Sequence, residues 1–353
     1  MDAEVIARIA LGAVLSRPHV RALLASAGSA RAALAAGGKG LAPRLAAALR
    51  RADPRAAERM LARASDSGVR ALAPDSAEFP AALREIPDAP LLLWLRGALP
   101  AGPALAIVGS RRPSSRARAC AQAFAAELAR AGVAIVSGLA YGIDGAAHEG
   151  ALAGGGPTVA VLASGLCIVT PHGQAPLAAR ILAAGGAWLS ERDPWADAHP
   201  RHFPERNRLI SGLARVTLLV EARERSGSLW SARHALEQGR DVAVVPGPID
   251  TDLCRGSNRL LREGATPILD ADDLRAAVLG PLAARPAAAP RAGGSPAARA
   301  ILAHLADGPC ELDQLARGLG RSPADLAPAL LELELEGRVR REGARLAATR
   351  AGS

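Results

Sequence analysis

The residues that could bind a ligand are concentrated in five loops, each beside a short apolar run. Glycines in these loops permit close backbone approach, and arginines can hold phosphate oxygens with two parallel hydrogen bonds. An exposed arginine is usually only solvated, but Arg201, Arg206 and Arg208 cluster where a helix should begin, which favours anion binding. The candidate binding residues are Gly109, Ser110, Arg111, Arg112, Ser137, Gly138, Arg206, Asn207, Arg208, Ser226, Gly227, Ser228 and Asn258.

Catalytic groups are scarce in the same loops. His148 is interpreted as a packing residue of an amphipathic helix, and Asp144 most simply begins that helix. Glu191 and Glu221 follow strands, but the sequence pairs neither with a second carboxylate. No G-x-G-x-x-G follows the first strand, no serine lies in G-x-S-x-G, and the single lysine, Lys39, completes no P-loop. We therefore expect no cofactor, no metal and no catalysis, and the loops favour binding of a nucleic-acid backbone.

Residues 103–279 must form the scaffold that positions these loops, because apolar strands and helices alternate there. Continuous apolar strands between helices predict a parallel sheet with helices on both faces, and ligands bind such sheets beyond the carboxyl ends of the strands. The expected strands are 104–109, 133–138, 158–163, 187–190, 216–222 and 241–247, the expected helices are 114–131, 142–155, 175–185, 205–213 and 228–239, and 257–279 is mixed.

The flanking segments predict smaller units. Residues 1–75 have helical spacing of apolar residues and predict a small helical domain, which residues 76–102 connect to the sheet through a short apolar strand. Residues 280–296 are rich in Pro, Ala and Gly and predict a flexible linker. Residues 297–353 predict a winged-helix-like domain of three helices and a hairpin, with helices at 311–319 and 323–336.

Winged helices often bind DNA through the third helix. In this chain that helix carries four carboxylates that would repel phosphate, so binding of a partner protein or a regulatory role is at least as well supported. These residues are Asp325, Glu332, Glu334 and Glu336.

Charge and composition narrow the function classes. The chain has 353 residues and a net charge of +9. Residues 103–279 are nearly balanced, with 19 basic and 17 acidic side chains, whereas residues 1–75 have 12 basic and 6 acidic side chains. The basic excess of residues 1–75 could hold nucleic acid or could be a solvated helical face. Only 2% of residues are aromatic, which excludes a broad platform of stacked rings. The four scattered cysteines, the absence of a signal peptide and the lack of a long apolar run predict a cytoplasmic protein.

Motifs from about Glu78 to Leu274 occur in the order and spacing of a known family. The chain resembles the DNA-processing protein A family (DprA/Smf), and the combination of motifs is highly specific although each alone is weak. The matching segments are FPAALREIPDAPLLLWLRG (79–97), IVGSRRPS (107–114), SGLAYGIDGAAHEGAL (137–152), TVAVLASGL (158–166), LSE (189–191), FPERNRLISGLA (203–214), LLVEARERSGSLWSA (218–232), VAVVPG (242–247) and GSNRLLREGA (256–265).

The resemblance implies an extended Rossmann-like domain that binds single-stranded DNA without catalysis and forms a homodimer. It also implies interaction with the RecA recombinase, which such proteins load onto incoming strands in natural transformation, and flanking helical and winged-helix-like domains. The family's anion pocket is carried over to Gly109, Ser110 and Arg111, to Arg206, Asn207 and Arg208, and to Ser226, Gly227 and Ser228.

The chain departs from the family pattern after the third strand. Cys167 and Thr170 stand where the family usually has an aspartate and the tyrosine of a Tyr-Pro pair, which puts one wall of the pocket in doubt. Two other function classes compete with this interpretation. A phosphoribohydrolase-like enzyme on a related fold would need a P-G-G-x-G-T-type loop, which residues 244–250 lack. A transcription regulator would need specific duplex binding by residues 297–349, against which the acidic third helix argues.

Overall fold

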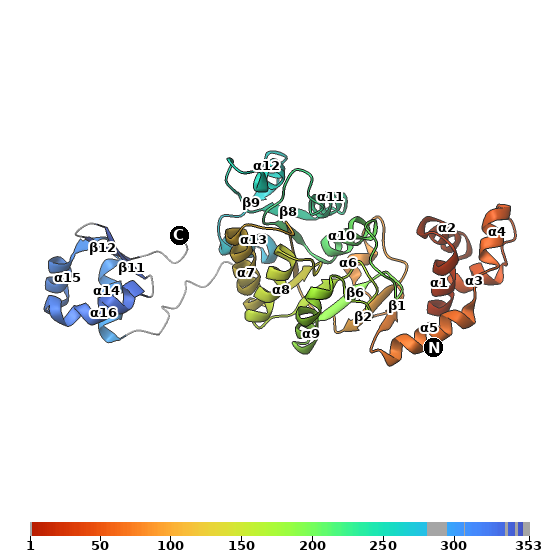
Figure 1. Ribbon diagram of the computed structural model, residues 1–353, viewed down its shortest axis with the longest axis horizontal. Helices are drawn as coiled ribbons and strands as arrows, with labels where there is room; N and C mark the ends of the chain where they lie inside the picture. The colour runs from red at the N-terminus through yellow and green to blue at the C-terminus, as the bar shows by residue number, and fades with distance from the viewer. Residues whose placement is uncertain (1, 281–294, 307, 336–337, 343–344, 349–353) are drawn as a thin grey trace. The chain divides into compact units, whose positions relative to one another are not determined.

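The chain folds around a nine-stranded sheet in which seven neighbouring strands are parallel (Figure 1). The computed structural model describes residues 2–280, 295–306, 308–335, 338–342 and 345–348. The chain divides into two compact units, residues 1–284 and 285–353. The strand order is β1 (Arg70–Leu72), β2 (Leu93–Gly97), β6 (Ala187–Ser190), β5 (Thr158–Val161), β4 (Ala134–Ser137), β3 (Ala104–Val108), β7 (Val216–Leu219), β8 (Asp241–Val244) and β9 (Thr266–Pro267).

Both faces of the sheet are buried because side chains alternate along each strand. Leu105 and Ile107 of β3 join the hydrophobic cluster beneath α7, α8 and α13, whereas Ala106 and Val108 join the cluster beneath α6, α10 and α11. Helices on both faces confirm the predicted α/β class. The helices of the sheet domain are α6 (Ala81–Arg84), α7 (Ser115–Arg130), α8 (Ile143–Ala153), α9 (Ala175–Ala183), α10 (His202–Leu213), α11 (Leu229–Glu237), α12 (Arg255–Arg262) and α13 (Ala271–Leu279).

The predicted helical segment and connector belong to the same compact unit as the sheet. Residues Arg70–Leu72, predicted as the end of the helical region, instead form the edge strand β1, which pairs antiparallel with β2. A strand of three residues is too short to show an alternating pattern in the sequence. The side chains of Trp94 and Trp188 share a hydrophobic cluster with residues of α1 and α5. The helices are α1 (Ala3–Val14), α2 (Arg17–Ala27), α3 (Ala30–Ala35), α4 (Pro43–Leu49) and α5 (Pro54–Asp66).

The second unit has the three helices and the hairpin that the sequence predicts for a winged helix. It adds one strand that the sequence did not reveal, β10, which completes a three-stranded sheet in the order β10, β12, β11. Most of the predicted linker, residues 281–294, lies outside the described residues, and so does Glu336. The elements are α14 (Pro296–Leu305), β10 (Cys310–Glu311), α15 (Leu312–Leu319), α16 (Pro323–Leu335), β11 (Val339–Glu342) and β12 (Arg345–Ala348).

No helix within the described ranges is long and apolar enough to cross a bilayer.

Candidate functional site

The strand order places a topological switch point beside β3. The chain passes from β3 through β4 and β5 to β6 on one side, then returns to build β7, β8 and β9 on the other side. The loops after β3 and β7 therefore diverge at the carboxyl edge, where open parallel sheets bind ligands. A hydrogen bond of 2.7 Å from the Ser110 N–H to the Glu221 carbonyl joins these two loops.

A cavity of about 640 Å³ opens at this switch point. Its lining comes from the loops after β3, β4 and β7 and from the first turns of α10 and α11. Nine of the thirteen candidate residues line it: Gly109, Ser110, Arg111, Arg112, Arg206, Asn207, Ser226, Gly227 and Ser228.

The first wall is the loop Gly109–Pro113, which Glu221 holds in place. The buried Glu221 carboxylate accepts hydrogen bonds from the Ser114 backbone N–H (3.1 Å) and from the Ser114 hydroxyl (2.7 Å). A Cβ on Gly109 would lie 2.7 Å from Ile143, so only glycine fits beneath this loop. Arg111 and Arg112 are exposed, and neither forms an ion pair in the part of the chain that the structure describes.

The floor of the cavity is the buried guanidinium of Arg206. It donates a hydrogen bond to the Val161 carbonyl and lies against Gly138, where a Cβ would overlap it. Burial, the dominant effect, lowers the pKa of Arg206 to about 10, although the charge of Asp144 opposes the shift. Arg206 therefore remains charged at neutral pH.

Asp144 fixes the loop behind this floor. Its Oδ2 accepts hydrogen bonds from the backbone N–H groups of Gly138 (3.2 Å) and Ala140 (3.3 Å). Leu139 between them has φ of 57°, a left-handed conformation that turns both N–H groups toward the same oxygen. Burial raises the pKa of Asp144, although the charge of Arg206 and these hydrogen bonds oppose the shift. Asp144 therefore builds the loop as well as starting α8.

The second wall of the cavity is the loop Ser226–Ser228. The Asn207 amide donates a hydrogen bond of 3.1 Å to the Gly227 carbonyl, which ties the loop to α10. The hydroxyls of Ser226 and Ser228 lie 2.7 Å apart. A Cβ on Gly227 would meet open space, so a ligand can approach this backbone directly.

Phe203 lines the cavity and was not among the sequence candidates. The Arg111 guanidinium lies 4.7 Å from the centre of its ring, within range of a cation–π contact. The helix α10 begins at His202, earlier than the predicted residue 205, so Phe203 and Arg206 stand one turn apart on the same face. The three-residue spacing of Phe203 and Arg206 can be read from the sequence. It indicates a shared helix face only if the helix already includes Phe203.

The family description "DNA recombination-mediator protein A" matches residues 70–278. The chain belongs to the DprA/Smf family. The description "DprA winged helix domain" matches residues 285–345. The chain is similar to protein Smf of Escherichia coli K12, with 39% identity over 74% of this chain and 73% of that protein.

Two solved structures of DprA proteins resemble this chain. The X-ray structure of DprA from Streptococcus pneumoniae has a TM-score of 0.60 and 34% identity, over 67% of this chain and 81% of that one. The structure of DNA processing protein A from Helicobacter pylori has a TM-score of 0.52 and 29% identity, over 58% of this chain and 93% of that one. The latter structure concerns the single-stranded DNA binding mode of the Helicobacter protein.

In this DprA/Smf family member, four of the candidate residues do not line the cavity. Arg208 forms ion pairs with Glu191 (2.6 Å) and Asp88 (3.0 Å) and is buried. The Ser137 hydroxyl donates to the Ile107 carbonyl within the sheet, and Gly138 lies behind Arg206. The Asn258 amide bridges the N–H and carbonyl of Gly247.

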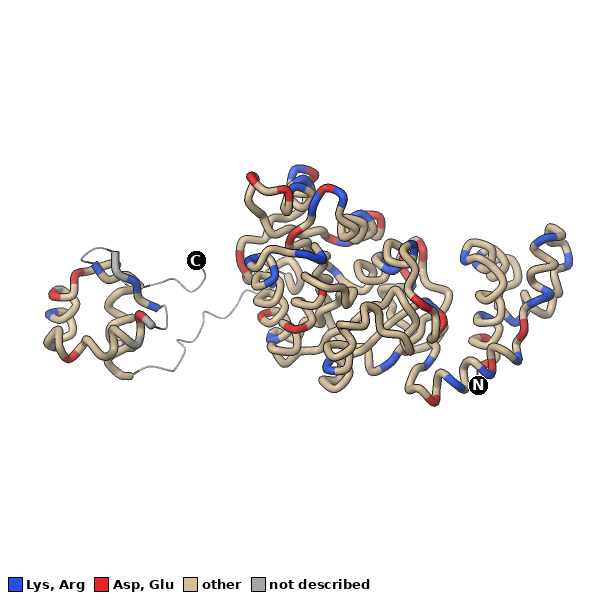
Figure 2. Tube along the Cα trace, viewed as in Figure 1, with Lys and Arg blue, Asp and Glu red and all other residues tan. Residues whose placement is uncertain are grey.

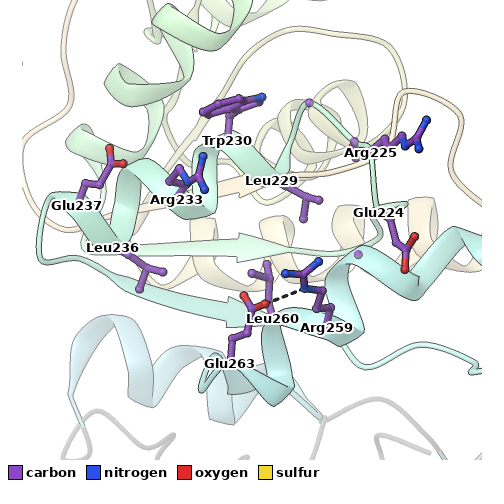
Figure 3. A pocket seen from close by; sticks show the side chains of 13 residues that line it. Glu224, Arg225, Leu229, Trp230, Arg233, Leu236, Glu237, Arg259, Leu260 and Glu263 are labelled. Carbon is purple, nitrogen blue, oxygen red and sulfur yellow. Dashed lines mark hydrogen bonds and ion pairs between the residues drawn. The ribbon is translucent and has the colours of Figure 1, made fainter.

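Figure 3 shows the lining of a second cavity, of about 620 Å³, in this DprA/Smf chain. It adjoins the first cavity and shares Ser226, Gly227 and Trp230 with it. The Arg233 guanidinium lies 5.2 Å from the centre of the Trp230 ring. Three arginines and three glutamates line this cavity, so their charges balance. The first cavity has three arginines and one carboxylate, Asp144, and is the one that favours an anion.

Within the ranges that the structure describes, no group of three or more His, Cys, Asp or Glu side chains could hold a metal ion.

Proposed function

We propose that this chain binds single-stranded DNA in the first cavity, mainly through phosphates, and catalyses no reaction. The observation that carries the proposal is the gathering of Arg111, Arg112 and Arg206 around one cavity at the carboxyl edge of the sheet. The Helicobacter relative, whose structure concerns single-stranded DNA binding, supports it.

Each part of the cavity has a role in holding the strand. The exposed guanidinium groups of Arg111 and Arg112 reach phosphate oxygens at the rim, where both are free of carboxylates among the described residues. The charge of Arg206 attracts a phosphate to the floor. The open backbone at Gly227 lets the strand approach closely, and the ring of Phe203 offers a stacking surface for a base.

The environment of the two glutamates that follow strands supports a binding function over catalysis. The Glu221 carboxylate is occupied by Ser114, and the Glu191 carboxylate by Arg17 and Arg208. Both groups are thus committed to holding loops and helices, and the carboxylates that share Arg17 with Glu191, those of Asp88 and Glu205, are themselves paired with this arginine.

We further propose that the bound strand is protected and passed to the RecA recombinase during natural transformation and recombination, and that the chain acts as a homodimer. The matched family description names a recombination mediator, which supports the interaction with a recombinase. Exposed apolar side chains support a protein interface on the sheet domain: Trp230, Leu236, Ile249 and Leu269 are 44%, 62%, 90% and 76% exposed.

A gel shift with single- and double-stranded oligonucleotides of equal length, with and without recombinase, tests the proposal. Preferential retardation of the single strand, and recombinase filaments that form faster on the strand when this protein is present, are expected. Equal affinity for both forms, or turnover of nucleoside monophosphates by the purified protein, would contradict it.

A further inference from the structure

A cluster of unpaired cations lies on the N-terminal helices, on a surface that the cavity does not use. Residues 39–55 contain five basic side chains and one acid, Asp53. All five basic residues are exposed, and no ion pair of theirs is found among the described residues. We name this surface the basic face; it consists of Lys39, Arg44, Arg50, Arg51 and Arg55.

The five side chains come from α4, from the turns on either side of it and from the first turn of α5. Ala46 and Leu49 point into the protein, so the opposite surface of the short helix faces solvent. Arg44 lies in the first turn of α4, Arg50 caps the end of this helix, and Arg51 follows in the turn that leads to α5. Figure 2 shows the basic segments on α4 and at the start of α5.

The one acid in this segment does not neutralise the face. The Asp53 carboxylate caps α5 by accepting the Arg55 backbone N–H (2.9 Å), and it pairs with Arg59 at 3.7 Å. Arg55 itself stands in the first turn of α5, where the helix dipole disfavours a cation. The charge of the basic face is therefore uncompensated within the described chain and would be stabilised by a bound polyanion.

This arrangement is not a general property of the arginine-rich N-terminal helices. Arg8 pairs with Glu4 at 3.1 Å, and Arg63 lies 3.9 Å from the centre of the Trp195 ring. Of the other arginines of residues 1–75, four more contact a carboxylate: Arg17, Arg21, Arg59 and Arg70. The unpaired cations are thus concentrated in the basic face, with Arg31 as the exception.

We propose that the basic face is a second binding surface for the phosphate backbone of single-stranded DNA, separate from the cavity. This inference rests on the proposed function, because it assumes that a strand held in the cavity continues onto the N-terminal helices. Four of the five cations are arginines, and one guanidinium group can donate two parallel hydrogen bonds to the oxygens of one phosphate. No large hydrophobic side chain of residues 2–75 is exposed, which disfavours a membrane or an apolar protein surface.

A neighbouring helix of the same segment, α2, docks beside the cavity. Arg17 of α2 forms ion pairs with Glu191 and Glu205, and Glu205 precedes the cavity residue Arg206 on α10. A strand that leaves the cavity along this side would reach the N-terminal helices without crossing the sheet domain. Contacts with more than one phosphate would then add to the affinity of long strands only.

The test compares two variants, each lacking four positive charges. The first replaces Arg44, Arg50, Arg51 and Arg55 by Gln. A control that removes the same number of charges replaces four exposed arginines of α7, α9 and the loop before β7, none of which lines either cavity and two of which, Arg118 and Arg130, pair with glutamates: Arg118, Arg130, Arg180 and Arg215. Anisotropy titrations use oligothymidylates of about 8 and about 60 nucleotides, at several salt concentrations.

For the basic-face variant we expect affinity for the long oligonucleotide to fall about tenfold or more, with a salt slope shallower by up to about 3, and unchanged affinity for the short one. The control should bind both oligonucleotides almost as the unchanged protein does. Equal losses in both variants, or an equal loss on the short and the long oligonucleotide, would overturn the inference. Failure of the unchanged protein to bind the short oligonucleotide would instead contradict the cavity proposal. Circular dichroism and thermal unfolding show whether each variant is folded.

Discussion

Arg206 and Arg208 face opposite sides of α10, although a single residue separates them. Arg206 lines the cavity and bonds the Val161 carbonyl, whereas Arg208 is buried against Glu191 and Asp88. Residues two apart on an α-helix are rotated by about 200°, so both cannot face one ligand. The two arginines therefore have different functions: Arg206 supplies a charge to the cavity, and Arg208 anchors α10 to the rest of the unit.

Replacement of Arg208 should lower stability without lowering the affinity for DNA. Arg208→Ala leaves the nearly buried carboxylate of Glu191 without its closest partner, and we expect about 3 kcal/mol or more of lost stability. The folded variant should still bind single-stranded DNA with nearly the original affinity, because the side chain does not reach the cavity. Thermal unfolding followed by an anisotropy titration well below the transition measures both. A variant of full stability with impaired DNA binding would place Arg208 in the binding surface after all.

Arg111→Ala should weaken binding of every strand regardless of base sequence. Arg111 is exposed at the rim of the cavity, and loss of one phosphate contact should make the salt slope shallower by about 0.7. Arg180→Ala is the matched control, because it removes an equally exposed charge from α9. If both variants lose the same affinity, then net charge, and not the position of Arg111, governs binding.

Gly138→Ala should impair binding without touching any ligand. The added Cβ would overlap the Arg206 guanidinium, which must then move from the floor of the cavity. We expect a loss of affinity similar to that of Arg206→Ala, together with lower stability. The two substitutions combined should cost little more affinity than either alone, because they act through the same side chain. Additive losses in this double-mutant cycle would contradict the mechanism.

The parallel sheet and the loops at its carboxyl edge could be predicted because apolar strands alternate with helices, and because Gly109 and Arg111 follow β3 closely while Ser226 lies in the loop between β7 and α11. The direction of each side chain could not. Arg208 and Asn258 follow the right elements, but their orientation depends on ion pairs and hydrogen bonds with Glu191 and Gly247, which are distant in sequence. The three-residue strand β1 also depends on its partner β2, and its own residues carry no pattern that reveals it.

Phe203→Leu should reduce affinity for strands with bases more than for a strand without them. The ring of Phe203 lies within 4.7 Å of the Arg111 guanidinium and is one of two aromatic rings that line the cavity, and stacking on a base contributes about 1–3 kcal/mol. Titration with oligothymidylate and with an abasic strand of the same length distinguishes stacking from phosphate contacts. The abasic strand should bind the variant and the unchanged protein almost equally. Equal losses on both strands would show that Phe203 only shapes the wall of the cavity.

The buried His148 should make the sheet domain sensitive to acid. Burial, and secondarily the charge of Arg206, lowers the pKa of His148 to about 3 from an ordinary value of 6.5. The Thr158 hydroxyl donates to the Ile135 carbonyl, so it accepts the proton on His148 Nδ1, and the ring is neutral in the folded protein.

Between pH 6.5 and about 3 the unfolded chain therefore binds one more proton at this site than the folded chain does, and the site lowers stability as the pH falls. The expected slope is about 1.4 kcal/mol of unfolding free energy per pH unit for one proton.

All four tryptophans lie in residues 1–284, so their fluorescence follows the unfolding of this unit alone. His148→Asn should lower stability at pH 7 by removing packed atoms but should flatten the loss below pH 6.5. Asp144, whose pKa burial raises, gains a proton in the folded state and acts in the opposite direction, so the difference between the two proteins isolates His148. Parallel pH curves for the two proteins would show that other groups cause the acid sensitivity.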